Sequence, residues 1–151
     1  VINKEGVKEY FQRGFVWNLE KNQNLIESIY SNIDCGKILV RHRKWTELEG
    51  MIKIGLTEEL SFYDIIDGKQ RLNAIRGFLD DEYPDHLGNY FSDLSINSQH
   101  AFNMSMLFSY SEIDGDVSDS YIISQFLKLN FMGVPQSKEH LDFVREINNK
   151  L

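Results

Sequence analysis

The fold of this chain is decided by the stretch Tyr63-Asp64-Ile65-Ile66-Asp67-Gly68-Lys69-Gln70-Arg71-Leu72-Asn73-Ala74-Ile75. Its first part, residues 62–67, is rich in the aromatic and β-branched residues that are typical of a buried strand. After Gly68, apolar residues recur three or four positions apart, which is the period of a helix. Glycine suits the turn between them, because it adopts backbone angles that a side chain penalises. The stretch therefore predicts a strand over residues 62–67 and a helix over residues 69–80 that packs on it.

The residues around this turn are polar and charged, and they suggest a binding site for an anion. The first turn of a helix has free N–H groups and the positive end of the dipole, and Lys69 and Arg71 add positive charge there. Asp67 is useful beside a bound phosphate if it holds a metal ion or a water molecule. The ordinary structural explanation is that Asp67 caps the helix and that the charges after it are solvated. The stretch matches neither the P-loop nor the Rossmann pattern.

Composition predicts one globular domain. The chain has 151 residues, of which 42% are hydrophobic and 13% aromatic, which excludes a disordered protein. The formal net charge of −7 argues against a surface devoted entirely to nucleic acid, although it allows a local basic patch. The chain begins with Val1 and not with methionine, so we expect a domain taken from a longer protein.

Cysteine and histidine usage predicts neither a disulfide framework nor a metal centre. Cys35 is the sole cysteine, which favours a reducing compartment and a cytoplasmic location. None of the four histidines is paired with cysteine or carboxylate at metal-ligand spacing. No apolar run is long enough to span a membrane and no signal peptide is visible, so no membrane partner is expected.

Other elements are predicted from apolar spacing and from capping residues. A helix capped by Asn18 begins at Leu19 and ends at Cys35-Gly36. Strands over residues 37–40 and 51–54 form a hairpin. Further along the chain we expect a helix over 98–104 capped by Ser98, a strand within 106–113, a helix from Asp119 and a last helix capped by Ser137.

The basic run Arg41-His42-Arg43-Lys44 lies in the predicted hairpin and has two interpretations. Charged residues on an edge strand discourage unwanted pairing, so the run is a solvated edge in the first interpretation. In the second, it contacts phosphates and Trp45 stacks on a base.

Three separate motifs together resemble a known family. Gln12-Arg13 with Trp17 resembles Q-R-x-x-V-W, and residues 67–72 resemble D-G-Q-Q-R-L. Residues 126–137 resemble F-x-R-L-N-x-x-G-x-P-x-S. In this order they resemble the N-terminal domain of GmrSD-type modification-dependent restriction enzymes, the D-G-Q-Q-R family of a ParB- and sulfiredoxin-like superfamily. The resemblance covers residues 9–147.

The resemblance implies an α/β fold of mixed α+β character: one domain over residues 1–151, with a small mixed sheet surrounded by helices. It also implies that the domain binds and hydrolyses a nucleoside triphosphate and works with a nuclease domain against foreign DNA. The chain departs from the family pattern in two places. Lys69 replaces the first glutamine of D-G-Q-Q-R, and Lys128 stands in a segment that carries arginine in the family. Lys69 also occupies the place of the sulfiredoxin cysteine, so that chemistry is not carried over.

The resemblance and the chemistry of the residues together give a set of expected roles. Lys69 and Arg71 hold phosphates, and Asp67 holds Mg²⁺ or orients the attacking water. The expected catalytic residues are Asp67, Gln70 and Arg71. The expected nucleotide-binding residues are Gln12, Arg13, Gly68, Lys69, Arg71 and Asn130. Trp17 is expected to be a packing residue that fixes Arg13. All these polar residues should line one cleft.

The leading hypothesis is a nucleoside triphosphatase domain of a DNA-targeting restriction, defence or phage counter-defence system. Its partners would be nucleotide, DNA, a nuclease domain or subunit, and a second copy of the chain. A second hypothesis is a module without turnover, either a nucleotide sensor or a DNA-binding ParB-like domain. A third is a protein-interaction decoy that engages a restriction complex.

Overall fold

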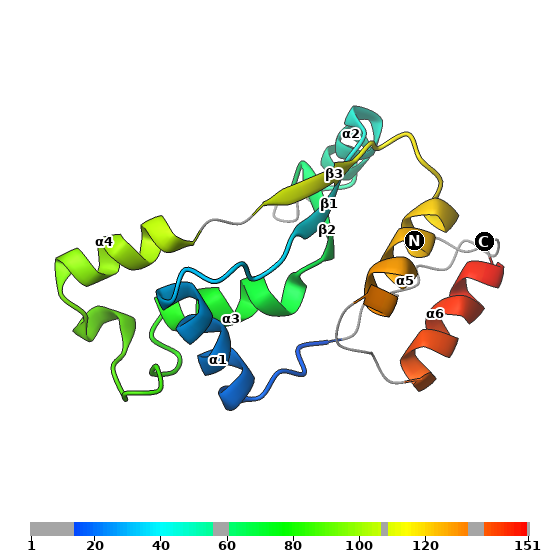
Figure 1. Cartoon of the computed structure of the whole chain (residues 1–151). Coiled ribbons are helices and arrows are strands. Elements are labelled where there is room, and N and C mark those ends of the chain that lie inside the picture. The colour runs from blue at the N-terminus through cyan, green and yellow to red at the C-terminus, as the bar shows by residue number, and fades with distance from the viewer. Residues whose placement is uncertain (1–13, 56–60, 107–108, 133–137, 151) are drawn as a thin grey trace. The chain divides into compact units, whose positions relative to one another are not determined.

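The computed structural model describes residues 14–55, 61–106, 109–132 and 138–150, with the backbone alone for residues 130–132 and 138 (Figure 1). Its elements in chain order are α1 (Leu19–Tyr30), β1 (Ile38–His42), α2 (Trp45–Lys53), β2 (Tyr63–Asp67), α3 (Lys69–Leu79), η1 (Phe91–Asp93), α4 (Ile96–Ser105), β3 (Tyr110–Ile113), α5 (Asp119–Met132) and α6 (Lys138–Lys150). A small sheet combined with helices confirms the mixed α/β class. No helix in the described ranges is long and apolar enough to cross a membrane.

The decisive stretch forms the strand and the helix that its sequence predicts. The helix packs against α1, and its packing on the strand stays a prediction. Residues 63–67 form β2 and residues 69–79 form α3. The strand order is β2-β1-β3, so β1 is the middle strand (Figure 1). β1 and β2 are antiparallel, with Val40 opposite Ile65 and Leu39 opposite Asp67, and the register is irregular between Leu39 and Val40.

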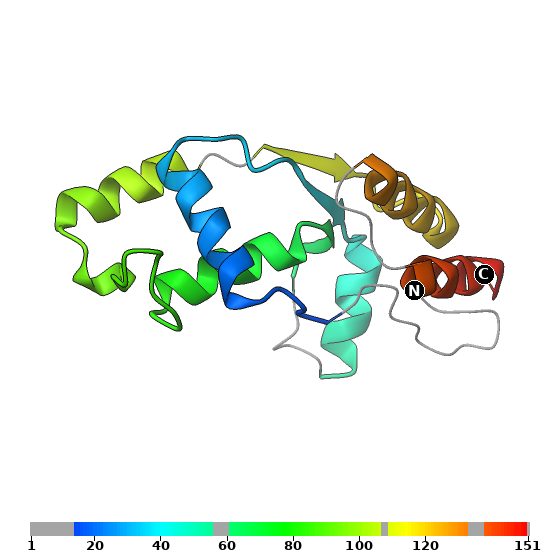
Figure 2. The same ribbon diagram turned by 60° about the horizontal axis from the view of Figure 1, so that its bottom comes forward.

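Two pairs of helices pack together, α1 against α3 and α5 against α6 (Figures 1 and 2). The predicted start of α1 is confirmed, because the Asn18 side chain accepts a hydrogen bond from the Lys21 amide. This bond satisfies one of the amide groups that a helix start leaves without a partner.

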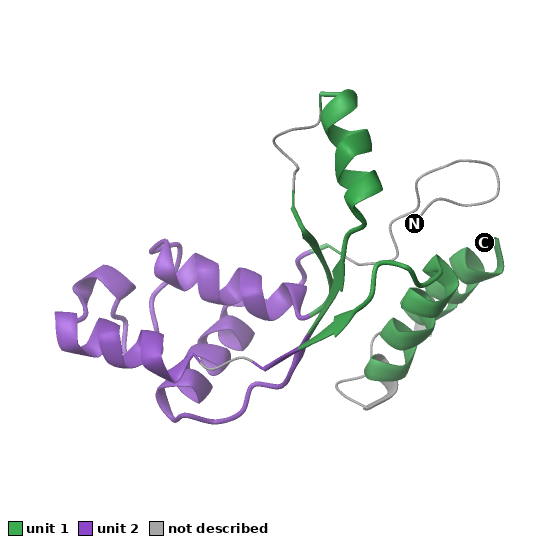
Figure 3. Cartoon of the chain, turned by 90° about the horizontal axis from the view of Figure 1, so that it is seen from above, with its two compact units in different colours: residues 1–14, 39–67, 111–151 green, residues 15–38, 68–110 purple. Residues whose placement is uncertain are grey.

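The chain divides into two compact units (Figure 3). Unit 1 comprises residues 1–14, 39–67 and 111–151, and unit 2 comprises residues 15–38 and 68–110. The boundary between Asp67 and Gly68 therefore falls inside the decisive stretch.

Unit 2 has an aromatic-rich core formed by α1, α3 and α4. Phe78 and Phe102 are buried, and their ring centroids lie 5.4 Å apart in an edge-to-face arrangement, a geometry that aromatic pairs favour. The Tyr83 hydroxyl donates a hydrogen bond to the Ala74 carbonyl, and burial raises the pKa of this phenol well above its usual range.

Unit 1 has a mainly aliphatic core between β2 and the pair α5 and α6. Its buried members are Ile66, Ile122, Ile123, Phe126, Val144 and Ile147. The two helices predicted in this part of the chain are thus present, and each buries apolar residues in this core.

Several sequence-based expectations are wrong. Residues 51–53 are helical, not a strand, since α2 covers Trp45–Lys53, and β1 pairs with β2 in place of the predicted hairpin. The prediction failed because a short apolar run does not distinguish a strand from a helix. The helix is supported by a side-chain contact across one turn, in which the Trp45 indole N–H donates to the Glu49 carboxylate at 2.7 Å.

Some predicted helix ends are also wrong. α1 ends at Tyr30 and does not extend to the predicted end at Cys35-Gly36. Two residues after Tyr30, Asn32 takes a left-handed conformation with φ 54°. α4 is capped by Ser95 rather than Ser98, because the Ser95 side chain accepts from the Ser98 amide. The strand predicted within 106–113 is present as β3, Tyr110–Ile113. The expected cap Ser137 lies outside the described residues.

Candidate functional site

The first turn of α3 is capped by a glycine. Gly68 has φ +100°, and its carbonyl accepts the Leu72 amide at 3.0 Å. Because Gly68 and not Asp67 occupies the cap position, the explanation that Asp67 caps this helix is wrong. As a glycine, the cap residue has no side chain with which to bond the first amide groups of α3. Such a helix start presents backbone N–H groups and the positive end of the helix dipole.

Asp67 is the last residue of β2, where it lies opposite Leu39 of β1. It belongs to unit 1, whereas the three polar residues of the first turn of α3 belong to unit 2. The sequence motif thus crosses the boundary between the two units.

The first turn of α3 contacts Phe15 and Val16. The Val16 amide donates to Gln70 Oε1 at 3.0 Å, and Lys69 Nζ lies 4.9 Å from the centroid of the Phe15 ring. Trp17 is partly buried against the core of unit 2, which confirms the expected packing of this ring. Gln12 and Arg13 lie outside the described residues. Phe15 and Val16, which follow them in the chain, make these contacts with the first turn of α3.

Arg71 binds backbone carbonyls. Its Nη1 donates to the Cys35 carbonyl and its Nη2 to the Lys37 carbonyl, each at 2.7 Å. The guanidinium thus connects α3 to the segment that leads into β1. Sequence reasoning assigned this side chain to phosphate and did not foresee these contacts.

Gly36 was missed by the sequence reasoning, which placed it at a helix end. It has φ +84°, and a Cβ added there would lie 2.9 Å from Arg71 Nη1. The glycine itself was the available signal, since glycine often marks a position where another group approaches the backbone closely.

Asn130 belongs to α5 in unit 1, and its side chain is outside the described set. Of the predicted site, the structure describes the consecutive residues Asp67, Gly68, Lys69, Gln70 and Arg71. The convergence of Gln12, Arg13 and Asn130 on them remains a prediction.

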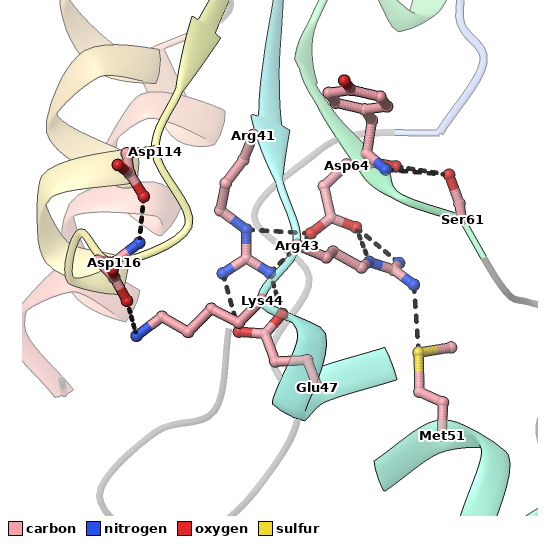
Figure 4. Close-up of polar contacts among 10 residues, drawn as sticks. Arg41, Arg43, Lys44, Glu47, Met51, Ser61, Asp64, Asp114 and Asp116 are labelled. Atoms are coloured by element: carbon pink, nitrogen blue, oxygen red, sulfur yellow. Dashed lines mark hydrogen bonds and ion pairs between the residues drawn. The ribbon is translucent and has the colours of Figure 1, made fainter. Parts of the chain in front are cut away.

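The basic run does not form a solvated edge, because β1 is the middle strand. Arg41 and Arg43 converge on the carboxylate of Asp64 at 2.8 and 2.6 Å, and Arg41 also binds Glu47 at 2.8 Å (Figure 4). Burial raises the pKa of Asp64, but the hydrogen bonds and charges of the two arginines outweigh it and hold the net pKa below its usual value. Trp45 remains 62% exposed.

The remaining cation of the run, Lys44, binds Asp116 at 2.9 Å. The lysine and both arginines are therefore engaged by carboxylates of the chain itself. This engagement favours a structural role for the run over the stacking and phosphate-contact interpretation.

Comparison with known proteins gives one family. The family model described as "GmrSD restriction endonuclease, N-terminal domain" matches residues 2–149 of the chain. No curated protein and no solved structure gives a significant match.

Proposed function

The chain belongs to the family of the GmrSD restriction endonuclease N-terminal domain, and on that premise we propose that it binds and hydrolyses a nucleoside triphosphate. Family membership supports a role in a restriction or defence system. The proposal assigns the nucleotide phosphates to the first turn of α3. DNA and a nuclease domain or subunit are its proposed partners, and a second copy of the chain is another.

One observation carries this proposal: the cap of α3 is a glycine in the left-handed conformation, followed directly by Lys69. A glycine cap has no side chain to cover the amide groups, and the helix dipole and a lysine both attract a phosphate. The contact of Gln70 supports the same location for the phosphates. Gln70 accepts a hydrogen bond from the Val16 amide, and Val16 follows Gln12 by four residues in the chain. We assign phosphate positioning to Gln12, Arg13 and Gln70, and a supporting contact to Asn130.

One carboxylate, that of Asp67, together with the nucleotide phosphates would suit Mg²⁺ that arrives with the nucleotide. The described residues contain no group of three or more His, Cys, Asp or Glu side chains that could hold a metal ion. Mg²⁺ usually keeps several waters and is bound by one or two carboxylates together with substrate phosphates. We assign Asp67 as that carboxylate or as the group that orients the attacking water. When bound, Mg²⁺ neutralises charge on the phosphoryl oxygens.

A nucleotide-binding module without turnover is the second candidate, and the contacts of Gln70 and Arg71 favour it. Both side chains bind backbone groups, of Val16 and of Cys35 and Lys37 respectively. Side chains held in this way shape a binding site without taking part in bond breaking. A decoy that engages a restriction complex would use the same surface without any nucleotide.

The test measures phosphate release from ATP, GTP, CTP and UTP, with and without Mg²⁺ and DNA, together with nucleotide affinity by calorimetry. Lys69→Met should weaken binding about tenfold, the effect of losing one charge-assisted contact. Lys21→Met is the matched control, because it removes the same charge from an exposed position on a helix of unit 2.

The outcomes separate the candidates. Binding with phosphate release supports the proposal, and binding without release under every condition favours the module without turnover. If the wild-type chain binds none of the four nucleotides, the proposed function is wrong.

A further inference from the structure

Arg71 uses both arms of its guanidinium on one short backbone segment. Nη1 donates to the Cys35 carbonyl and Nη2 to the Lys37 carbonyl, both at 2.7 Å. These distances are at the short end for N–H···O bonds, as expected when the donor is charged. We name this arrangement, formed by Cys35, Gly36, Lys37 and Arg71, the arginine clasp.

The clasp lies beside two glycines, and at one of them, Gly36, a side chain would collide with the guanidinium. A Cβ on Gly36 would lie 2.9 Å from Arg71 Nη1, and a Cβ on Gly68 would lie 3.4 Å from Arg71 Nη2. Both residues have positive φ, +84° and +100°, which other residues rarely adopt. The backbone on both sides of the guanidinium thus has the shape that this contact requires.

The clasp also supports the turn that opens α3. The next residue after Lys37 is Ile38, which is buried and whose amide donates to the Ser109 carbonyl at 3.0 Å. A Cβ on Gly68 would lie 3.0 Å from Ile38 Cγ1, so Ile38 packs closely on the Gly68 turn. Arg71 therefore holds in place the segment against which this turn rests.

We infer that Arg71 is a positioning residue, which serves the α3 site by holding residues 35–37 against the Gly68 turn and not by contacting phosphate itself. This inference rests on the proposed function, because the site it positions is the nucleotide site. The first-turn amides and Lys69 then bind the phosphate, and the geometry of those amides depends on the clasp.

Cys35 provides a reporter of the clasp that needs no nucleotide. It is the sole cysteine in the sequence, and its thiol is partly buried and donates to the Ile33 carbonyl at 3.3 Å. Opening the clasp releases the backbone of Cys35 and exposes this thiol. The rate of alkylation by a small maleimide therefore measures how tightly residues 35–37 are held.

The experiment compares the 151-residue wild-type chain with Arg71→Lys and Gly36→Ala. Lysine keeps the charge but lacks the planar fork that bridges two carbonyls. Gly36→Ala leaves Arg71 intact and displaces its guanidinium. Gly50→Ala is the control for adding a methyl group, because a Cβ there meets nothing within 4 Å. Alkylation rates and nucleotide affinities are measured for all four proteins.

We expect both Arg71→Lys and Gly36→Ala to alkylate faster than the wild-type chain. Both should bind nucleotide about tenfold more weakly, because displaced first-turn amides lose about as much as one hydrogen bond to the phosphate. Gly50→Ala should be unchanged in both measurements. Nucleotide added to the wild-type chain should not accelerate alkylation. Acceleration would mean that phosphate has taken the guanidinium from the carbonyls, which overturns the inference.

Two further results would also overturn it. Wild-type affinity in Gly36→Ala despite faster alkylation would show that the clasp does not serve the site. Unchanged alkylation in both variants would refute the clasp itself. Failure of the wild-type chain to bind nucleotide is a different result, which refutes the proposed function and with it the role of the clasp in binding.

Discussion

At the scale of single residues, the proposed function assigns to Asp67 the role that separates nucleotide binding from turnover. Asp67 is the last residue of β2, and the cap position of α3 is occupied by the next residue, Gly68. Asp67→Asn should strongly reduce phosphate release, because an amide neither holds Mg²⁺ well nor orients water as a carboxylate does. Nucleotide affinity should survive or rise as a negative charge leaves.

The measurement is phosphate release and calorimetry on the same preparations. Asp80→Asn is the matched control, since Asp80 is exposed at the other end of α3. Unchanged phosphate release by Asp67→Asn would remove Asp67 from the proposed chemistry.

Gly68 provides a second prediction at this scale. Gly68→Ala introduces a side chain at φ +100° and places a Cβ 3.0 Å from Ile38 Cγ1. The left-handed conformation alone costs about 1–2 kcal/mol, and crowding against Ile38 adds to that cost. Urea denaturation should therefore show a lower free energy of unfolding.

Gly88→Ala separates the two contributions to that cost. Gly88 has φ +86°, but a Cβ there meets nothing within 4 Å. We expect Gly88→Ala to show the conformational cost alone, and so a smaller loss than Gly68→Ala. Equal losses would show that Ile38 yields without cost and that the turn is not closely packed.

At the scale of elements, Asp64 of β2 binds two arginines, Arg41 in β1 and Arg43 just after β1. Its carboxyl is 29% exposed and accepts from both Arg41 and Arg43. Its pKa in the folded protein lies below the ordinary value, about 3.9 for an unfolded chain, so this contact stabilises the fold above that pH. The stabilisation is lost as the pH falls through the lower folded pKa.

Asp64→Asn should therefore cost about 1–2 kcal/mol at pH 7, allowing for partial exposure. Below about pH 4 the difference from the wild-type chain should shrink. Urea denaturation at several pH values measures both effects. Asp116→Asn is the control. The Asp116 side chain is 83% exposed, so its ion pair with Lys44 contributes little to the free energy of unfolding. A pH-independent effect of Asp64→Asn would contradict this account.

At the scale of the whole molecule, the two units have separate hydrophobic clusters. Phe78 is central to the cluster of unit 2 and Ile123 to that of unit 1, and both are 0% exposed. Phe78→Ala should cost about 3–5 kcal/mol, because it leaves a cavity in the core. Amide hydrogen exchange should lose protection chiefly in α1, α3 and α4.

Ile123→Ala is the reciprocal variant, and it should lower protection chiefly in α5 and α6. Equal loss of protection in both units by either variant would show that the chain unfolds as one cooperative body.

The sequence by itself determined the mixed α/β class, β2, α3, the cap of α1 and the family. These follow from local spacing, from single capping residues and from motifs that need no knowledge of distant contacts. α2 was misassigned because Met51-Ile52-Lys53-Ile54 is too short an apolar run to favour either period.

Tertiary structure decided the partners of the charged residues. Nothing in the sequence indicates that Arg71 binds the Lys37 carbonyl, because the two residues are 34 positions apart. Likewise, Arg41 and Arg43 lie within ion-pair distance of Asp64 because β1 pairs with β2 in the sheet. A charged side chain binds whichever opposite charge or carbonyl the fold brings within hydrogen-bond distance, and sequence spacing does not encode that distance across separate elements.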